Sequence, residues 1–299
     1  MAGTGVRWAT AGDVELAFET FGRPAGPPVL LIMGLAMQML GWPQELCTDL
    51  ARRGHHVIRY DNRDIGLSTH LDHLPAGDAA AVMRGDRSSV AYTIGDLALD
   101  AVRLMDALGL GRAHLVGASL GGAIAQTVAL SHPHRVRSLT SIMASTGDRR
   151  VGTSTPRAMA AVLAPPARTR EAAIARAVHI ARVVGSTGFP FDEEAARDRA
   201  ACAYDRGYDP AGVSRQLVAL LTAPDRTARL RTLAVPSLVI HGDRDPLVSP
   251  DGGRATAAAI PGAELLLVEG MGHDLPRAVW PRLAERIAAL VARAEAAPG

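Results

Sequence analysis

Residues 114–126 read HLVGASLGGAIAQ, and this stretch decides how the chain folds. The apolar run at 113–116 is typical of a short buried strand, and 120–130 is rich in good helix formers. Ser119 stands between them, inside the pattern Gly-Ala-Ser-Leu-Gly at 117–121. A lone serine between small residues at such a junction predicts a tight turn that exposes the hydroxyl above a sheet edge.

Strand and helix patterns alternate around this junction. Val14 to Phe21 alternates apolar and polar residues, which is typical of a half-exposed antiparallel strand. Further strands are predicted at 28–33, 57–60, 113–116 and 136–143, and helices at 46–53 and 94–108. The alternation predicts an α/β fold with a mostly parallel central sheet flanked by helices.

The alternation stops after residue 144. Four helical stretches follow without a convincing strand, at about 156–164, 170–184, 192–205 and 211–222. Strands then return at 236–241 and 264–268, and helices at 251–259 and 280–293. We therefore expect a core at 1–144 and 226–299 with a helical cap, or lid, inserted at 145–225. Such a cap would cover the carboxyl edge of the strands, where ligands bind in sheets of this kind.

Composition excludes several classes of function. Of 299 residues, 48% are hydrophobic and 21% charged, and the formal net charge is +2, as in ordinary globular proteins. No basic stripe indicates nucleic-acid binding, no apolar run approaches the length of a membrane span, and no signal peptide is recognised. Cys47 and Cys202 suit neither a disulfide framework nor a zinc site and are expected to be half-buried thiols. We expect a cytoplasmic monomer or homodimer that binds no nucleic acid and no membrane.

A serine nucleophile needs a base, and the base needs an orienting carboxylate. The strand at 236–241 runs into HGDRDPLVSP, which offers Asp243 and Asp245. We favour Asp245, deeper in the loop and before a proline, and expect Asp243 to accept backbone amides in the turn. The next strand runs into GMGHDLP, where two glycines flank His273. The sequence predicts Ser119, Asp245 and His273 as nucleophile, acid and base, in this chain order.

The other histidines are expected to have no catalytic role. His241 is predicted to pack beneath the acid loop. His55, His56, His132 and His134 are predicted at the surface or at helix ends.

Two backbone amides are candidates for an oxyanion hole. The Leu120 N–H begins the helix after the serine, and the Leu35 N–H follows Gly34, which permits a turn. The stretch YDNRDIGLST at 60–69 offers Asp61 and Arg63 either as a catalytic acid and binding arginine or as a buried brace; we favour the brace. Further side chains either pack in the core or line an apolar acyl pocket: Met37, Met39, Met105, Met159, Phe189, Phe191, Tyr204 and Tyr208.

The motifs GASLGG, DNRDIGLS, HGDRDPLVSP and GMGHDLP, in their order, resemble the α/β-hydrolase superfamily. Within it, GDVELAFETFG, LLIMGLAMQMLGWP, HHVIRYDNRDIGLST and GSTGFPFDEEAARDRA are most similar to bacterial serine esterases of the aclacinomycin methylesterase group. The resemblance implies a Ser119, Asp245 and His273 triad, an oxyanion hole of Leu35 and Leu120, and substrate contacts near Gly34. Residues 197–199 read Arg-Asp-Arg where an anthracycline-binding esterase would carry a tryptophan, which argues against a polyaromatic glycoside.

These features predict a serine hydrolase that cleaves a carboxylic ester, such as a methyl ester, of a small hydrophobic or polyketide-like molecule. The reaction would pass through an acyl-enzyme and use no metal or organic cofactor. Alternatives on the same fold are a polyketide thioesterase or cyclase, a lactonase, a perhydrolase, another non-hydrolytic tailoring enzyme, and a non-catalytic binder. Epoxide hydrolases and haloalkane dehalogenases are disfavoured because they carry aspartate where this chain has Ser119.

Overall fold

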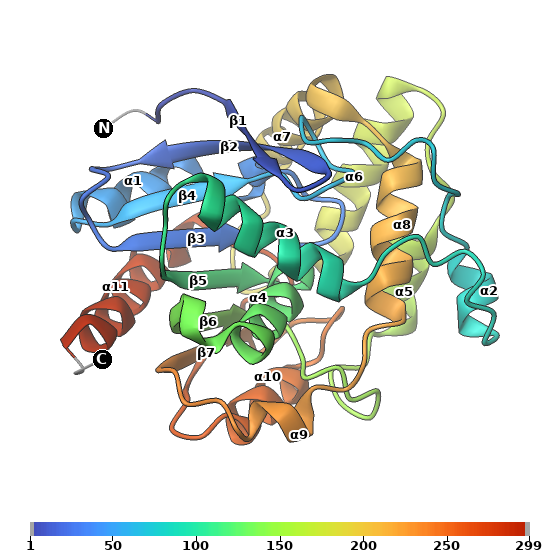
Figure 1. Ribbon diagram of the computed structural model, residues 1–299. Helices are drawn as coiled ribbons and strands as arrows, with labels where there is room; N and C mark the ends of the chain where they lie inside the picture. Colours follow the sequence, from blue (N-terminus) through green and yellow to red (C-terminus); the bar gives the residue numbers. More distant parts are fainter. Residues whose placement is uncertain (1–2, 297–299) are drawn as a thin grey trace.

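The computed structural model describes residues 3–296 and centres on an eight-stranded sheet of order β1-β2-β4-β3-β5-β6-β7-β8 (Figure 1). β2 runs antiparallel to both its neighbours, and all the other pairs are parallel. The predicted, mostly parallel α/β sheet is confirmed. Its strands are β1 (Arg7–Ala11), β2 (Val14–Phe21), β3 (Pro28–Ile32), β4 (His56–Tyr60), β5 (Ala113–Ala118), β6 (Val136–Ile142), β7 (Ser237–Gly242) and β8 (Glu264–Val268).

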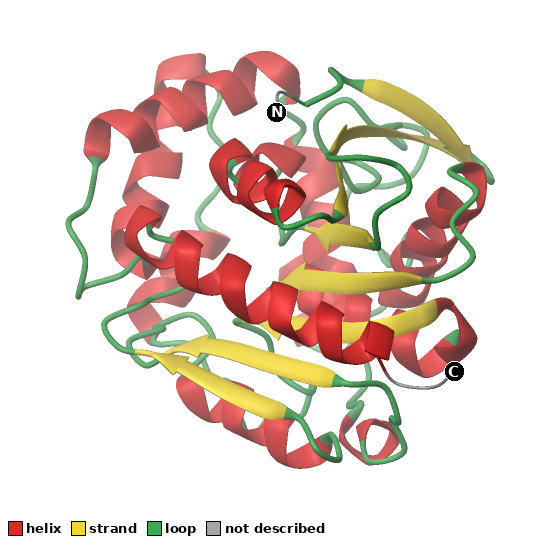
Figure 2. Cartoon of the chain, turned by 90° about the vertical axis from the view of Figure 1, so that its left-hand side faces the viewer, coloured by secondary structure: helices red, strands yellow, loops and turns green. Residues whose placement is uncertain are grey.

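Helices cover both faces of the sheet (Figure 2). One face packs against α1 (Gln44–Arg52) and α11 (Trp280–Ala296), and the other against α3 (Ile94–Ala107), α4 (Leu120–Ser131) and α10 (Pro250–Ala259). Alternate residues of β3 divide between the two cores: Leu30 and Ile32 join the α3 side, and Val29 and Leu31 the α1 side. A parallel strand buried on both faces therefore reads as a continuous apolar run.

The helical insertion, residues 145–225, lies beyond the carboxyl ends of the parallel strands, at the right of Figure 1. It holds α5 (Pro156–Leu163), α6 (Arg170–Val184), α7 (Glu193–Gly207) and α8 (Pro210–Leu221), and these 81 described positions contain no strand. α6 and α7 pack through a small cluster of their own, Ile174, Val178 and Ala196. The division of the chain into two domains at these boundaries stays a prediction.

Three short elements escape the sequence patterns. They are β1, α2 (Ala79–Met83) and α9 (Thr227–Leu230). Three 3-10 turns complete the described secondary structure: Met39–Gly41, Pro133–Arg135 and Arg277–Val279. No helix within residues 3–296 combines the length and the hydrophobicity that crossing a bilayer requires.

Two predictions about burial are wrong. His55 and His56 are buried rather than at the surface or a helix end, because His56 opens β4 between β2 and β3 and His55 directly precedes it. Burial lowers the pKa of both imidazoles. The thiols are not half-buried either: Cys47 lies in the core, where burial raises its pKa to about 12, and Cys202 is exposed on α7.

Candidate active site

The loop between β5 and α4 holds Ser119 in a strained turn. Its φ of 54° and ψ of −117° lie outside the regions that residues with side chains prefer. A Cβ at Gly117 would meet the Gly121 carbonyl oxygen at 2.0 Å, and one at Gly121 would meet the Ile32 oxygen at 2.0 Å. Positions 117 and 121 must therefore both be glycine for β5 and α4 to approach this closely.

Ser119 lies in a hydrogen-bonded chain with His273 and Asp245. His273 Nε2 is 2.9 Å from Ser119 Oγ, and His273 Nδ1 is 2.7 Å from Asp245 Oδ2. An ionised carboxylate only accepts, so Nδ1 carries the proton and Nε2 accepts from the serine hydroxyl. The fold thus joins three side chains from the carboxyl ends of β5, β7 and β8.

Asp245 is buried and held from several directions. Its Oδ1 accepts the N–H groups of Leu247 and Val248, both at 2.9 Å, and His241 Nε2 lies 3.4 Å from Oδ2. Burial alone would raise the pKa of Asp245, but electrostatic attraction to the His273 ring and the hydrogen bonds from His241, His273 and Val248 outweigh it. The pKa therefore falls well below its ordinary value, and the group stays ionised.

The second acid of the same loop has a different partner. Asp243 Oδ1 accepts the N–H of Gly270 at 2.7 Å and so ties the acid loop to the base loop. His241 lies beneath the acid loop, where its Nε2 contacts the Val248 carbonyl at 2.8 Å. The geometry thus favours Asp245 over Asp243 as the partner of His273.

The loop after β3 approaches the serine closely. A Cβ on Gly34 would lie 3.2 Å from Ser119 Cβ and 3.7 Å from its Oγ. Within residues 3–296, neither the Leu35 N–H nor the Leu120 N–H donates a hydrogen bond. Leu120 begins α4, so its amide is one of the unpaired donors at a helix N-terminus, with the positive end of the dipole behind it.

Several residues that support this loop carry no sequence signal. Gln38 Nε2 donates to the carbonyls of Ala203 and Gly207, and Arg206 Nη1 donates to Gln38 Oε1 at 2.7 Å and to Asp61 Oδ2 at 2.8 Å. These contacts join positions more than 140 residues apart, so only the folded chain reveals them. Asp61 acts here as a structural brace, in line with our favoured interpretation.

The predicted pocket side chains have varied surroundings. Met39 and Met105 are fully buried and belong to the core. Tyr204 and Tyr208 stack on each other with ring centres 4.9 Å apart, and Phe191 lies under the Arg182 guanidinium. Gly34 borders Ser119, as described above. Substrate contacts of these and the remaining residues stay predictions: Gly34, Met37, Met159, Phe189, Phe191, Tyr204 and Tyr208.

Residues 197–199, Arg-Asp-Arg, are all exposed on α7. The missing tryptophan therefore changes a solvent-facing stretch of α7, and it gives no ground for excluding a polyaromatic substrate.

Among residues 3–296, one group of side chains has the spacing of metal ligands, but an arginine lies against it. Asp64, His70 and Asp209 offer ligand atoms within 4.8 Å of one another. Arg215 Nη2 lies 2.8 Å from Asp64 and 3.6 Å from Asp209, so its guanidinium supplies the positive charge there. The group is better described as an ion-pair network than as a metal site.

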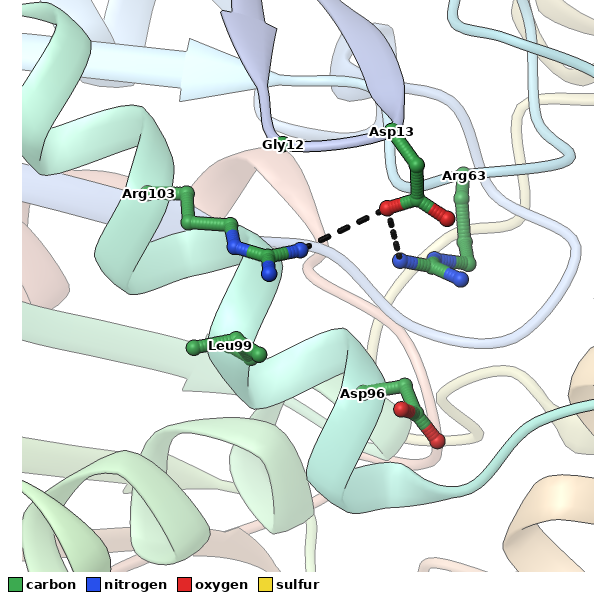
Figure 3. A pocket seen from close by; sticks show the side chains of 6 residues that line it. All are labelled: Gly12, Asp13, Arg63, Asp96, Leu99 and Arg103. Atoms are coloured by element: carbon green, nitrogen blue, oxygen red, sulfur yellow. Dashed lines mark hydrogen bonds and ion pairs between the residues drawn. The ribbon is translucent and has the colours of Figure 1, made fainter.

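A polar hollow of about 500 Å³ lies between the β1–β2 turn and α3 (Figure 3). Asp13, on the β1–β2 turn, lies 3.4 Å from Arg103 and 3.8 Å from Arg63. Of the six residues that line it, only Arg63 is a sequence-based candidate for binding, and none belongs to the predicted triad, oxyanion hole or pocket. The hollow thus lies outside the serine site.

Comparison with known proteins agrees with this geometry. Residues 27–276 match the family model described as alpha/beta hydrolase fold. The rhodomycin D methylesterases DauP, of a Streptomyces species, and DnrP, of Streptomyces peucetius, are each 34% identical to the chain, covering 95% of it and 97% of their own length.

Solved structures show the same fold. An esterase from Rhodococcus sp. ECU1013 has a TM-score of 0.72 at 22% identity, covering 96% of this chain and 98% of its own. The enol-lactonase from Burkholderia xenovorans LB400 has a TM-score of 0.71 at 23% identity, covering 96% and 100%. The resemblance seen in the motifs is confirmed: the chain belongs to the α/β hydrolase family, as a carboxylic-ester hydrolase related to the methylesterases.

Proposed function

We propose that this protein hydrolyses a methyl ester of a polycyclic, polyketide-derived molecule, with Ser119 as its nucleophile. The observation that carries the proposal is the continuous hydrogen-bonded chain from Ser119 through His273 to Asp245. Similarity to rhodomycin D methylesterases over nearly the whole chain supports the substrate class. Turnover would yield the free acid and methanol.

In the first half of the reaction, His273 Nε2 takes the hydroxyl proton while Ser119 Oγ attacks the ester carbonyl carbon. The amides of Leu35 and Leu120 donate to the oxyanion as it forms. His273 returns the proton to the leaving methoxide, and methanol departs from the acyl-enzyme. Asp245 keeps the imidazole oriented and stabilises its positive charge.

In the second half, His273 activates water, which attacks the acyl-serine carbonyl. The tetrahedral species collapses to the free acid, and Ser119 regains its proton from His273. We further propose that the protein acts in the cytoplasm as a monomer or homodimer, as the sequence predicts.

The proposal is tested with rhodomycin D and a panel of methyl esters, lactones and thioesters in ¹⁸O-labelled water. The acid should gain one labelled oxygen and the methanol none, because the acyl–oxygen bond breaks. Ser119→Ala should lower kcat on the order of 10⁵-fold or more. It should also abolish the covalent adduct that a fluorophosphonate is expected to form with Ser119 of the wild type, as measured by intact-protein mass. Ser131→Ala, an exposed serine at the far end of α4, is the matched control. Full activity in Ser119→Ala, or a product of unchanged mass, would favour non-hydrolytic tailoring instead.

A further inference from the structure

The loop that carries His273 is bonded to the end of α6, in the helical insertion. The His273 N–H donates to the Val184 carbonyl at 2.7 Å, and the Gly188 N–H donates to the Gly270 carbonyl at 2.9 Å. Val184 is the last residue of α6, so the base itself satisfies a carbonyl that the helix end would leave unpaired.

Two side chains complete this contact on either side of the base. The Gly272 N–H donates to Ser186 Oγ at 2.9 Å, and Ser186 Oγ donates to Asp274 Oδ1 at 2.5 Å. The residues before and after His273 are thus joined through one hydroxyl. Because that hydroxyl both accepts and donates, it binds the backbone before the imidazole and the side chain of the residue after it.

The approach of the two segments is as close as backbone allows. A Cβ on Gly272 would lie 2.4 Å from the Gly185 carbonyl, and one on Gly188 would lie 2.4 Å from Gly270 Cα. The glycines therefore permit direct backbone contact, and Ser186 and Asp274 supply its polar side chains. Burial raises the pKa of Asp274, while hydrogen bonding to Ser186 and the charge of His273 oppose that rise.

We propose that Ser186 and Asp274 are positioning residues that hold His273 in line with Ser119 and couple its orientation to the end of α6. The inference rests on the proposed role of His273 as the base. Neither side chain reaches the reacting atoms in this arrangement; each acts on the base through the loop backbone. A catalytic imidazole displaced by a fraction of an ångström loses rate, because proton transfer depends steeply on geometry.

The test compares Ser186→Ala and Asp274→Ala with the conservative variants Ser186→Thr and Asp274→Asn. The readouts are the rate of Ser119 phosphonylation by a fluorophosphonate, kcat and KM for a methyl ester, and the melting temperature. Thr187→Ala is the matched control, because Thr187 lies in the same segment, is exposed, and makes no side-chain hydrogen bond within the described residues.

We expect both alanine variants to lower kcat and the phosphonylation rate about 10- to 100-fold, with KM changed less than 3-fold. Threonine keeps a hydroxyl and asparagine keeps an acceptor, so both should retain most of the rate. The double alanine variant should be no slower than Ser186→Ala, since Ser186→Ala already removes the hydrogen bond that Asp274→Ala removes.

Alanine variants that react as fast as wild type, or a double variant with multiplied losses, would overturn the inference. So would an asparagine variant as slow as alanine, because the role would then be the charge. A wild type without any serine adduct would instead refute the proposed function, so the two failures are distinguishable.

Discussion

Asp64 and Arg215 form a bidentate ion pair in which both side chains are buried. Arg215 Nε and Nη2 lie 2.9 and 2.8 Å from the two carboxylate oxygens, and the side chains are 0% and 1% exposed. The two residues stand 151 positions apart, in the loop after β4 and in α8. The pair therefore fixes the helical insertion to the sheet.

Arg215→Met should destabilise the protein by about 3–5 kcal/mol, because a buried carboxylate would lose its cation. Burial raises the pKa of Asp64, but the hydrogen bonds from Arg215 and the Leu71 N–H, with the charge of Arg215, hold it below its ordinary value. Without Arg215 the carboxyl would protonate more readily. The deficit should therefore shrink as the pH falls. Urea unfolding at pH 7 and pH 5 measures both effects.

A second substitution checks the cause of that loss. Asp64→Asn in the Arg215→Met background removes the buried charge, and asparagine tolerates the positive φ of 67° at this position. It should recover part of the lost stability. Equal stability of Arg215→Met and wild type would contradict the role of the pair.

Gly34→Ala should lower kcat/KM about 10- to 100-fold, less than the loss of a whole oxyanion donor. The new methyl group would press on the Ala118 carbonyl and on Ser119 Cβ at 3.2 Å and displace the loop that carries the Leu35 amide. Gly111→Ala is the control, because a Cβ there meets no atom within 4 Å. Steady-state kinetics and melting temperatures of both variants separate a loss of catalysis from a loss of stability. A Gly34→Ala enzyme with full activity would argue against Leu35 as a donor.

Asp245→Asn should reduce kcat on the order of 10⁴-fold, because the amide no longer holds the proton on Nδ1 of His273. Asp243→Asn, in the same loop, keeps an oxygen that can accept the Gly270 N–H and should stay within a few-fold of wild type. Activity measurements on the pair settle which acid serves the base. A larger loss in Asp243→Asn would reverse the assignment.

His114 should make the protein sensitive to mild acid. It is 1% exposed on β5, with Nδ1 2.9 Å from Ser138 Oγ and Nε2 3.1 Å from Glu295, and burial lowers its pKa from 6.5 to about 4. The unfolded chain therefore takes up a proton at this site below pH 6.5, and the folded chain does not until about pH 4. The stability that the neutral ring contributes is present above pH 6.5 and is lost across this window.

Between pH 7 and pH 4.5, the free energy of unfolding of the wild type should fall by about 2–3 kcal/mol more than that of His114→Gln. Denaturant unfolding at both pH values measures the difference. His179→Gln, an exposed histidine on α6, should follow wild type. Parallel pH dependence of wild type and His114→Gln would show that this ring does not govern acid stability.

Three of the strands that carry the site, β3, β5 and β7, could be predicted because they are buried on both faces. β3, for example, reads as PVLLI without interruption. The edge strand β8 could be predicted because its sequence, ELLLV, is an apolar run although Leu265 is exposed. β1 could not, since Arg7–Ala11 is a largely exposed edge strand, and four or five residues of α9 or α2 show no helical period.

The residues of the site also divide into those that a local sequence pattern marks and those that it does not. Ser119 and His273 are marked by neighbouring glycines that their turns require, and Asp245 by its place after a strand. The contacts of Ser186 with Asp274, and of Gln38 with Arg206, depend on segments meeting in space. Serine, aspartate, glutamine and arginine are frequent in loops and helices of any protein, so no local pattern distinguishes these four.

The separation of 154 residues between Ser119 and His273 has a consequence for the growing polypeptide. A ribosome that has released β5 and α4 has produced the complete serine turn, but neither β7 nor β8 yet exists. Such a chain, or one cut short before residue 264, has Ser119 without His273, and we expect it to be hydrolytically inert. Esterase activity should thus appear only once the last strand has joined the sheet.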